Sequence, residues 1–460
     1  MKDLQDTICA LSTAPGRAGI AVVRLSGVES FGLLRKVFAP DKALADLPAR
    51  HAILGRIIDA RTGTEIDQAL ATCFPSPNSY TGEDVVEISL HGSPVLVSVL
   101  LDSLCAHGAR LAEPGEFTMR AFLRGRMDLA QAEAVRDVVE ATTVYQAQVA
   151  SRQRSGDLSR QLEPAKSLLT DIIVQLESAV EFAEEDLGLE SREMLAGKLG
   201  HAQEEVGKWI DSFRRGRIVR DGFSMAIVGR PNVGKSSLFN ALLAQDRSIV
   251  LETPGTTRDL VSEYTNLEGI PVRLLDTAGV RASGDRVEQI GVDRSFRAMA
   301  DADAILLVVD ASQPPEEEDE RLRERLAAMS CILVMNKCDL ASVWSPEQKQ
   351  AYAGDWPSMG VSALTGEHID LLRKAILEHL FGDSTAQRDG ILVTNLRHCH
   401  CLEAARDHLA RASAALRQGL SEEFALVDLH AGLRSLGAIT GETSVEDILG
   451  EIFSRFCVGK

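Results

Sequence analysis

The most informative chemistry in the sequence lies at Gly229–Ser236, where the residues GRPNVGKS fit the pattern GxxxxGK[ST] of a phosphate-binding loop. An apolar run, Phe223–Val228, precedes this motif and a helix-like run, Ser237–Leu243, follows it, which is the context that such a loop requires. Backbone N–H groups of the loop can surround phosphates, the ammonium of Lys235 can reach the β and γ oxygens, and the hydroxyl of Ser236 can bind Mg²⁺. The sequence therefore predicts a site for a nucleoside triphosphate.

Three further motifs indicate which nucleotide binds. Asp276–Gly279 (DTAG) follows a second apolar strand and suits the Mg²⁺ shell and the γ-phosphate, and Thr256–Asp259 (TTRD) lies before it, where a switch loop belongs. Asn336–Asp339 (NKCD) follows another apolar strand, and the carboxylate of Asp339 can accept hydrogen bonds from N1 and N2 of guanine, which adenine cannot satisfy. Together with Ser362–Leu364 (SAL), which follows as a loop at the edge of the base, this order of motifs predicts a GTP-binding domain. The predicted GTP-binding residues are Asn232, Val233, Gly234, Lys235, Ser236, Ser237, Thr256, Thr257, Asp276, Thr277, Ala278, Gly279, Asn336, Lys337, Asp339, Ser362 and Ala363.

The residue that follows the DTAG motif bears on the mechanism of hydrolysis. Many GTPases place a Gln there to orient the attacking water, but this chain has Val280, whose side chain cannot form a hydrogen bond with water. Another polar group must take that role, and the candidates in the same segment are Glu288 and Asp285. Arg258 and Arg281 lie near the site in the sequence, but we interpret both as structural or switch residues and not as arginine fingers.

The chain is long enough for several domains, because 460 residues at about 150 per domain give roughly three. Residues 1–120 mix short β-branched runs with turns and one helix-like stretch, so we expect an α+β domain there. Residues 121–217 and 384–460 carry apolar residues at helical spacing, whereas residues 218–383 alternate strands and helices. We therefore expect a discontinuous helical domain into which an α/β domain of the P-loop GTPase class is inserted.

Composition and charge exclude several classes of protein. Apolar residues make up 45% and charged residues 25% of the chain, which excludes a mainly disordered or fibrous protein. The net charge of −18 excludes a surface that is basic throughout, so any contact with RNA must use local patches such as Arg120, Arg124 and Arg126. The N-terminus does not resemble a signal peptide, and no apolar run approaches the ~20 residues of a membrane span. With eight cysteines in no regular pairing, which fits reduced thiols, we expect a cytoplasmic protein without membrane contact.

Several strings outside the nucleotide motifs are distinctive. They are Pro15–Arg17 with Arg24, Tyr80–Asp84 through Glu87, Glu113–Phe117 through Asp128–Glu133, and the terminal Cys457–Lys460. Together with the GTPase motifs, these strings resemble the MnmE (TrmE) family of tRNA modification GTPases over the whole chain. The N-terminal strings and the terminal Cys-x-Gly-Lys are much more specific to that family than the phosphate-binding loop is.

The resemblance implies that a potassium ion takes part in hydrolysis. Asn232 matches the asparagine that binds K⁺ in the phosphate loop of this family, where the cation replaces an arginine finger when two G domains meet. The resemblance also implies that Glu288 is the catalytic glutamate, which supplies the polar group that Val280 lacks. Pro254 departs from the family pattern and stiffens the loop at the potassium site. The metal ligands that the resemblance implies are Ser236 and Thr257 for Mg²⁺, and Asn232, Leu251, Thr253 and Thr256 for K⁺.

The resemblance further implies a tetrahydrofolate site in the N-terminal domain. Arg24, Glu87, Arg126 and Lys460 match the family's contacts to 5-formyl-tetrahydrofolate, and a methylene derivative is an alternative ligand. Arg126 stands where a Lys is familiar, which keeps the charge but alters the geometry of the contact. Because Lys460 is the last residue, the chain end must fold back onto the N-terminal domain, within one subunit or across a dimer.

For function, the resemblance implies a GTP-hydrolysing component of a tRNA-modifying enzyme. In this family the protein is a homodimer through its N-terminal domain and forms a heterotetramer with a flavoprotein, MnmG. Together they modify carbon 5 of the wobble uridine (U34) of tRNA with aminomethyl or carboxymethylaminomethyl groups, using a tetrahydrofolate as one-carbon donor. The alternative is a regulatory GTPase that binds RNA or ribosomes without modification chemistry, and folate binding distinguishes the two.

Three cysteine-containing patterns need a separate interpretation. His398–Cys401 (HCHC) carries consecutive ligand-type residues, which point in different directions on a helix and do not have the spacing of zinc sites. Cys338 lies inside the guanine-reading motif, and we interpret it as a filler because Asn336 and Asp339 do the reading. For Cys457, a catalytic role that the family motif suggests and a structural role both stay open.

Overall fold

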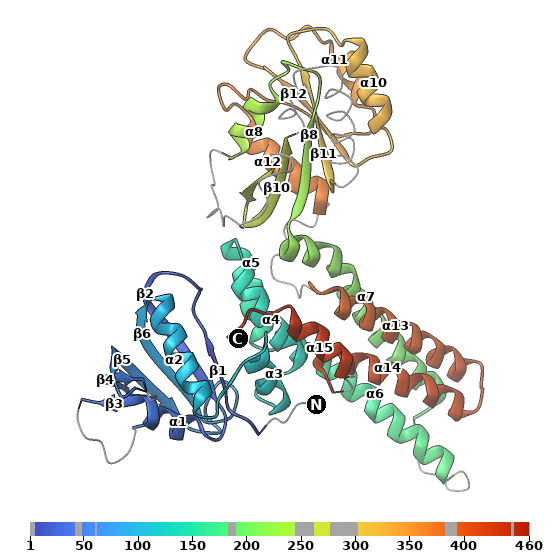
Figure 1. Cartoon of the computed structure of the whole chain (residues 1–460). Coiled ribbons are helices and arrows are strands. Elements are labelled where there is room, and N and C mark those ends of the chain that lie inside the picture. Colours follow the sequence, from blue (N-terminus) through green and yellow to red (C-terminus); the bar gives the residue numbers. More distant parts are fainter. Residues whose placement is uncertain are drawn as a thin grey trace. The chain divides into compact units, whose positions relative to one another are not determined.

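The computed structural model describes residues 5–41, 48–59, 62–182, 190–243, 262–276, 302–381, 393–442 and 446–459. The chain divides into two compact units, and Figure 1 shows their elements in the colours of the sequence. Unit 1 contains Met1–Arg136, Arg152–Leu199 and Arg411–Lys460, and unit 2 contains Asp137–Ser151 and Gly200–Ala410. Within the described ranges, no helix is both long and apolar enough to cross a membrane.

Unit 1 begins with a seven-stranded sheet in the spatial order β3-β4-β5-β6-β2-β1-β7. Neighbouring strands are antiparallel except β1 and β7, which are parallel. The strands are β1 (Ile8–Leu11), β2 (Ala18–Ser26), β3 (Phe38–Pro40), β4 (Ala52–Ile58), β5 (Glu65–Phe74), β6 (Val85–Gly92) and β7 (Arg110–Leu111). The α+β character expected of the N-terminal residues is therefore confirmed.

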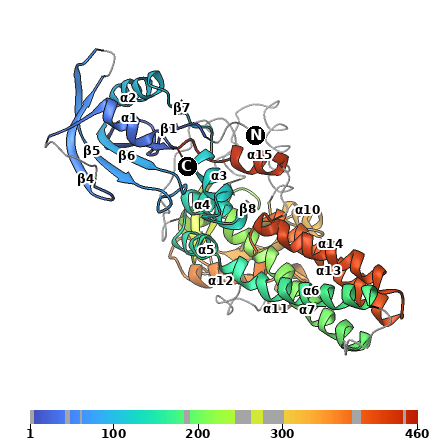
Figure 2. The same cartoon turned by 90° about the horizontal axis from the view of Figure 1, so that it is seen from below.

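The two faces of this sheet carry different side chains. The helices next to it are α1 (Ser30–Val37), α2 (Pro94–Ala106) and α3 (Glu116–Leu123). Apolar residues of α1 and α2 form one core with alternate residues of the strands, so both helices cover the same face (Figure 2). Because side chains alternate along a strand, Arg24 of β2 and Glu87 of β6 belong to the opposite face. α3 places Phe117 against β1 on that opposite face.

Helices make up the remainder of unit 1. They are α4 (Leu129–Glu140), α5 (Val144–Arg154), α6 (Asp157–Glu181), α7 (Arg192–Asp221), α13 (Leu396–Arg417), α14 (Glu422–Thr440) and α15 (Glu446–Ser454). Of these, α4, α5, α7 and α13 extend into unit 2. α6 buries Leu162, Leu169 and Leu176, which recur at helical spacing, and it packs along α14. An ion pair between Lys166 of α6 and Glu442, just after α14, joins the same two helices. The helical segments that the sequence predicts are therefore present.

Unit 2 is built on a six-stranded sheet in the order β13-β12-β11-β8-β10-β9, in which only β9 is antiparallel to its neighbour among the described strands. Its strands are β8 (Phe223–Val228), β9 (Ser262–Leu267), β10 (Ile270–Asp276), β11 (Ala304–Asp310), β12 (Cys331–Asn336) and β13 (Ser358–Gly360). Its helices are α8 (Lys235–Leu243), α10 (Glu317–Leu326), α11 (Pro346–Ala353) and α12 (Ile369–Phe381).

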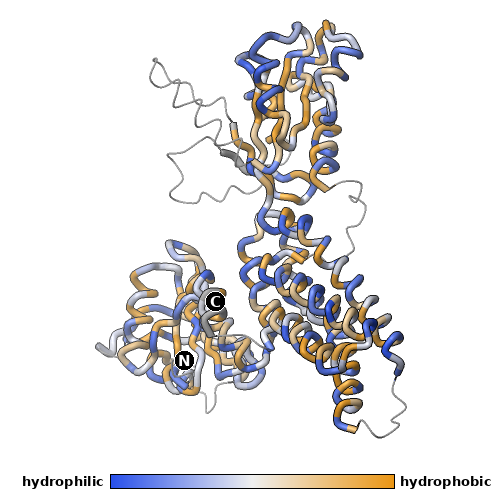
Figure 3. The backbone as a smooth tube through the Cα atoms, turned by 90° about the vertical axis from the view of Figure 1, so that its right-hand side faces the viewer, coloured by the Kyte–Doolittle hydropathy of each residue, from blue (hydrophilic) through white to orange (hydrophobic). Residues whose placement is uncertain are grey.

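Helices cover both faces of this second sheet. Leu306 and Val308 of β11 share a core with α8 and α12, whereas Ile305 and Leu307 share a core with α10 and α11. A strand that is buried on both faces is apolar throughout and does not alternate. Figure 3 shows this continuous hydrophobic character along the central strands. The α/β class that the sequence predicts for this segment is confirmed.

The end of the chain folds back onto the N-terminal sheet within one chain. The hydroxyl of Ser12 donates a hydrogen bond to the carbonyl of Gly459 at 3.1 Å, and the N–H of Gly115 donates to the carbonyl of Cys457 at 3.4 Å. Gly459 has φ of 95°, and a Cβ atom there would lie 2.2 Å from the carbonyl oxygen of Leu11. Position 459 therefore requires glycine, both for its positive φ and because the backbone lies too close to Leu11 for a side chain.

Replacing this glycine tests the closure. We expect Gly459→Ala to release the tail, because a Cβ atom adds both a clash and the ~1–2 kcal/mol that an L-residue loses in a left-handed conformation. Hydrogen exchange of residues 453–459, measured by mass spectrometry, is expected to rise by roughly tenfold. Gly450→Ala in α15 is the matched control, because a Cβ there meets no atom within 4 Å. Equal exchange in all three proteins would show that this contact does not hold the tail.

Candidate functional site

Four parallel strands of unit 2 end at one edge of the sheet, where the predicted nucleotide motifs begin. β8 ends at Val228, directly before the phosphate loop, β10 ends at Asp276, β11 at Asp310 and β12 at Asn336. In open sheets of this kind, ligands bind outside the carboxyl ends of the strands. The fold therefore brings the phosphate-binding and base-reading motifs to the same edge, although they are far apart in the sequence.

The phosphate loop connects β8 to α8. Nζ of Lys235 donates hydrogen bonds to the carbonyl oxygens of Gly229 and Arg230, at 2.8 Å each, so the ammonium lies within the curve of the loop. Asn232 has a positive φ of 65°, and α8 begins at Lys235. The exposed polar residues of this segment are Asn232, Ser236 and Ser237. The helix N-terminus thus presents N–H groups and hydroxyls that suit a phosphate and its cation.

A buried amide joins the phosphate loop to the base-reading loops. Asn336 is 2% exposed. Its Nδ2 donates to the carbonyl of Val233 at 2.8 Å, and its Oδ1 accepts from the N–H of Ala363 at 3.0 Å. Gly234 passes so close that a Cβ atom there would lie 2.2 Å from Nδ2 of Asn336. The second glycine of the phosphate loop is therefore required by the base-reading asparagine as well as by the turn.

Asp310 is a member of the site that the sequence reasoning missed. Nζ of Lys337 donates to its Oδ2 at 2.6 Å, and the N–H and hydroxyl of Ser312 donate to its Oδ1 at 2.9 and 2.6 Å. Burial alone would raise the pKa of Asp310, but the hydrogen bonds from Lys337 and Ser312 hold that pKa below its usual value. A signal was available, because the apolar run Ala304–Val309 ends in this Asp just as Ile332–Met335 ends in Asn336.

The remaining base-reading residues flank this amide. Asp339 is exposed in the loop after β12, where a base can reach its carboxylate. Ser362 is buried, its N–H donates to the carbonyl of Glu367 at 3.0 Å, and its hydroxyl accepts from the N–H of Thr365 at 3.2 Å. These bonds shape the loop that carries Ala363.

Part of the predicted site lies outside the described residues. These positions are Leu251, Thr253, Pro254, Thr256, Thr257, Arg258, Thr277, Ala278, Gly279, Val280, Arg281, Asp285, Glu288 and Lys460, together with the side chain of Asp276. The catalytic glutamate, most of the potassium site and the second Mg²⁺ ligand therefore stay predictions.

A second group of predicted residues meets on the face of the N-terminal sheet opposite α1 and α2. Arg24 and Glu87 are direct cross-strand partners, and Nε and Nη2 of Arg24 donate to Oε1 of Glu87 at 3.0 and 2.7 Å. The guanidinium carbon lies 5.3 Å from the ring centre of Tyr80 and 5.7 Å from that of Phe117. The result is a charged pair enclosed by two aromatic rings, which suits a flat, polar ligand.

Of the other predicted folate contacts, Arg126 lies beside the loop before β6. Arg126 is exposed, and its Cγ would lie 3.3 Å from a Cβ atom at Gly82, in the loop that also carries Tyr80. Leu11, which the chain end approaches, pairs with Val23, the residue before Arg24. The structure thus brings the tail close to Arg24 along the strands, although Lys460 itself lies outside the described residues.

The arginine cluster that could dock RNA is only partly available for that role. Arg120 is 1% exposed and donates to the carboxylates of Asp6 at 2.5 Å, Glu116 at 2.9 Å and Glu83 at 3.3 Å. Arg124 pairs with Glu83 at 2.8 Å. Arg120 is therefore a structural residue of a buried ion network and not a docking site.

The cysteine patterns have different outcomes. None of the eight cysteines, all of which lie within the described ranges, forms a disulfide. On α13, His398 and Cys399 are buried, His400 is exposed and Cys401 is half-buried, and their ligand atoms do not gather into a metal-type group among the described residues. Cys457 is exposed.

Comparison with known protein families gives two matches that together cover most of the chain. The family described as MnmE helical domain matches residues 129–457, and the family described as GTP-binding protein TrmE N-terminus matches residues 7–126. A tRNA modification GTPase MnmE from Koribacter versatilis (strain Ellin345) is 44% identical over 459 residues, which is 100% of both chains. The chain belongs to the MnmE family.

A second relative matches over the same length. The MnmE protein of Alkaliphilus oremlandii (strain OhILAs) is 40% identical over 459 residues, covering 99% of this chain and 100% of that one. Among solved structures, the G domain of the T. maritima FeoB iron transporter is 30% identical over 34% of this chain and 98% of that chain, with a TM-score of 0.27. Because the chain belongs to a family of tRNA modification GTPases, its nucleotide-binding edge is a P-loop GTPase site for GTP and Mg²⁺, which Lys235, Ser236 and Asn336 fit.

The amide of Asn336 gives a direct test of how this edge is held together. We expect Asn336→Ala to weaken GDP binding by at least roughly tenfold and to lower the free energy of unfolding by ~1–3 kcal/mol, because Val233 and Ala363 lose buried hydrogen bonds. Calorimetric titration and denaturant unfolding measure the two effects. The control is Asn240→Ala on α8, where the asparagine is exposed. Wild-type GDP affinity in Asn336→Ala would exclude the amide as the link between the loops.

Proposed function

We propose that this chain is the GTP-hydrolysing component of an enzyme that modifies carbon 5 of the wobble uridine (U34) in tRNA. The added groups are of the aminomethyl or carboxymethylaminomethyl type, and the flavoprotein MnmG is the partner. The name of the full-length relatives, tRNA modification GTPase, supports the substrate class. The observation that carries the proposal is the return of the chain end to the end of β1, beside the strand that carries Arg24, because a GTPase that only regulates RNA binding has no need of that closure.

The N-terminal face is proposed to hold the tetrahydrofolate derivative, which supplies the one-carbon unit. The aromatic rings of Tyr80 and Phe117 and the exposed guanidinium of Arg126 fit a ligand with a flat ring system and carboxylates. Both hydrogen bonds from Arg24 go to Oε1 of Glu87, and within the described part of the chain no donor lies at Oε2. That oxygen can accept from the N–H groups of a pterin while Arg24 keeps the carboxylate in place. Lys460 is proposed as the further cationic contact.

In the nucleotide site, Lys235 is proposed to bind the β and γ oxygens, and Ser236 and Thr257 the Mg²⁺ ion. Asn232, Thr256 and the carbonyls of Leu251 and Thr253 are proposed as ligands of K⁺, which supplies positive charge where no arginine finger is identified. The exposed position of Asn232 at the rim of the phosphate loop supports this assignment. Glu288 is proposed to orient the attacking water.

The chain is proposed to form a homodimer through its N-terminal domain. Leu54 of β4 and Leu70 of β5 are direct cross-strand partners, and both are exposed, at 47% and 42%. Paired exposed leucines on the open face of a sheet support a protein–protein contact there. The further assembly with MnmG and tRNA is proposed from the family and uses local surfaces, because the net charge is −18.

The link between hydrolysis and modification is tested in cells. We expect Glu288→Ala to abolish GTP hydrolysis in K⁺ and, with it, the formation of the modified wobble uridine. GDP affinity is expected to stay within about twofold of wild type, because only a group that acts in the transition state is lost. Mass spectrometry of wobble nucleosides measures the product. Asp285→Ala is the matched variant and is expected to keep both activities. Loss of hydrolysis in Asp285→Ala alone would transfer the role to Asp285, and normal modified uridine in a hydrolysis-dead strain would favour the regulatory alternative.

The folate site is tested by binding. We expect Glu87→Gln to weaken 5-formyl-tetrahydrofolate by roughly 10–100-fold, because hydrogen bonds to charged groups contribute about 1.5–3 kcal/mol. GTP hydrolysis is expected to be unchanged. Glu65→Gln on β5 is the control, because this carboxylate is exposed and meets Arg56 only at 3.5 Å. Calorimetry that detects no folate binding by the wild-type chain would refute the site.

A further inference from the structure

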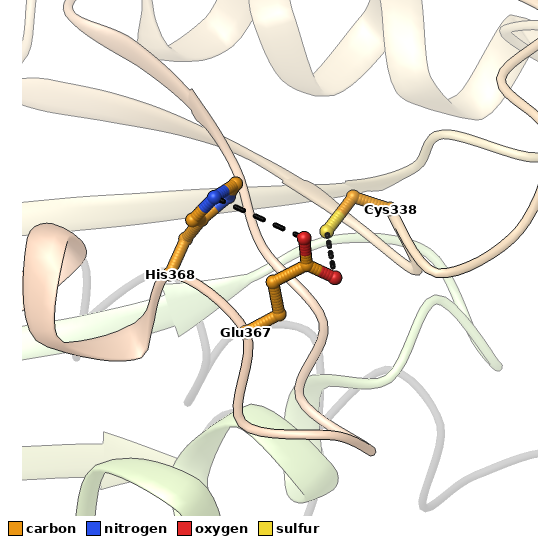
Figure 4. A group of neighbouring side chains, drawn as sticks. All are labelled: Cys338, Glu367 and His368. Carbon is orange, nitrogen blue, oxygen red and sulfur yellow. Dashed lines mark hydrogen bonds and ion pairs between the residues drawn. The ribbon is translucent and has the colours of Figure 1, made fainter.

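Three side chains with metal-binding atoms meet beside the base-reading loops of unit 2. One ligand atom each of Cys338, Glu367 and His368 lies within 4.8 Å of the others, and Figure 4 shows the carboxylate of Glu367 in contact with both the thiol and the imidazole. Sγ lies 3.9 Å from Oε2 of Glu367, and Nε2 of His368 lies 3.9 Å from Oε1. Cys338 is half-buried, and the other two are exposed to solvent.

The backbone holds these three residues in place. Cys338 belongs to the loop after β12, and its N–H donates to the carbonyl of Val361 at 3.0 Å. Glu367 and His368 precede α12, and the carbonyl of Glu367 accepts from the N–H of Ser362 at 3.0 Å. The cluster therefore joins the two loops that carry Asp339 and Ala363, the predicted readers of guanine.

The imidazole is set up as a metal ligand by its own hydrogen bond. Nδ1 of His368 lies 3.0 Å from the carbonyl oxygen of Gly360. Because a carbonyl can only accept, Nδ1 must carry the proton, and Nε2 then has a lone pair on the side of Glu367 and Cys338. A second hydrogen bond that fixes the tautomer in this way accompanies most histidine ligands of metals.

The charges around the thiol also favour a cation. Burial raises the pKa of Cys338, and the carboxylates of Glu367 and Asp339 raise it further. The same two carboxylates attract a positive ion. When the ion binds to the sulfur, it replaces the thiol proton, which is released to the solvent. Sulfur and nitrogen ligands select a zinc-type ion over Mg²⁺ or Ca²⁺.

We propose that Cys338, Glu367 and His368 bind a zinc-type ion that pins the two guanine-reading loops together. The metal takes Sγ, one carboxylate oxygen and Nε2, and water occupies the fourth tetrahedral position. Metal–ligand bonds of about 2.0–2.3 Å put tetrahedral donors about 3.3–3.8 Å apart, so side-chain rotations suffice to close the present distances. In this proposal Cys338 is a metal ligand, which differs from its interpretation as a filler in the sequence.

The consequence for the nucleotide follows from the position of the cluster. In the present structure Asn336 contacts Val233 and Ala363, and the two loops are placed to bind guanine. An ion that binds both loops stabilises this arrangement. By linkage, the metal tightens guanine nucleotides and the nucleotide tightens the metal by the same factor. The coupling between metal and nucleotide rests on the proposed guanine-reading role of these loops, whereas metal binding itself does not.

Cobalt(II) titration of the full chain tests the site directly. With a phosphine reductant present, we expect a near-ultraviolet thiolate-to-cobalt band that stoichiometric Zn²⁺ removes. Cys338→Ser and His368→Asn are expected to lose the high-affinity band, and asparagine tolerates the positive φ of 60° at position 368. Cys401→Ser is the control, because it removes the less buried of the two thiols in the rival HCHC run. No band in the wild type, or an unchanged band in Cys338→Ser, would overturn the proposal.

A GDP titration with Mg²⁺ present tests the coupling. We expect saturating Zn²⁺ to tighten GDP about fivefold in the wild-type chain, at the lower end of typical couplings between sites, and a chelator to reverse the change. Cys338→Ser is expected to bind GDP equally with and without Zn²⁺. Equal GDP affinity with and without Zn²⁺ in a wild-type chain that shows the cobalt band would overturn the pinning of the loops. Neither result depends on tRNA or folate, so this proposal can fail while the proposed function stands.

Discussion

The buried guanidinium of Arg120 is the interaction on which the N-terminal part of unit 1 depends. A charge that is 1% exposed is tolerated only when close partners offset its loss of hydration. Asp6, Glu83 and Glu116 supply those partners from the segment before β1, from the loop before β6 and from α3. Since removal of one partner would leave a buried charge uncompensated, the three segments hold one another in place.

The position of α3 decides where the proposed folate face and the chain end lie. Phe117 stands one residue after Glu116 and faces the guanidinium of Arg24. Gly115, at the start of the same helix, lies so close to α15 that a Cβ atom there would be 2.7 Å from the carbonyl of Phe453. The ion network therefore positions the aromatic enclosure and the docking surface for the tail through one helix.

The nucleotide edge is held by weaker links. Asn336 uses neutral hydrogen bonds, and the ion pair of Lys337 with Asp310 lies at the rim of the sheet. Each neutral hydrogen bond contributes only about 0.5–1.5 kcal/mol net, which suits loops that bind and release a nucleotide in every cycle. A metal at Cys338 would reinforce these loops without a larger buried network.

The features that the sequence determined by itself are local motifs or periodic patterns within one element. The phosphate loop needs only consecutive residues between a strand and a helix, and the helical spacing of Leu162 and Leu169 needs only one helix, so both were predictable. The tertiary structure alone decided the burial of Arg120, the role of Asp310 and the meeting of Cys338 with His368. These depend on contacts between segments that the chain folding brings together, and a charged or thiol residue looks the same in sequence whether it is solvated or enclosed. The return of the tail was predictable from Lys460, but its closure within one chain depends on the space that Gly459 leaves beside Leu11.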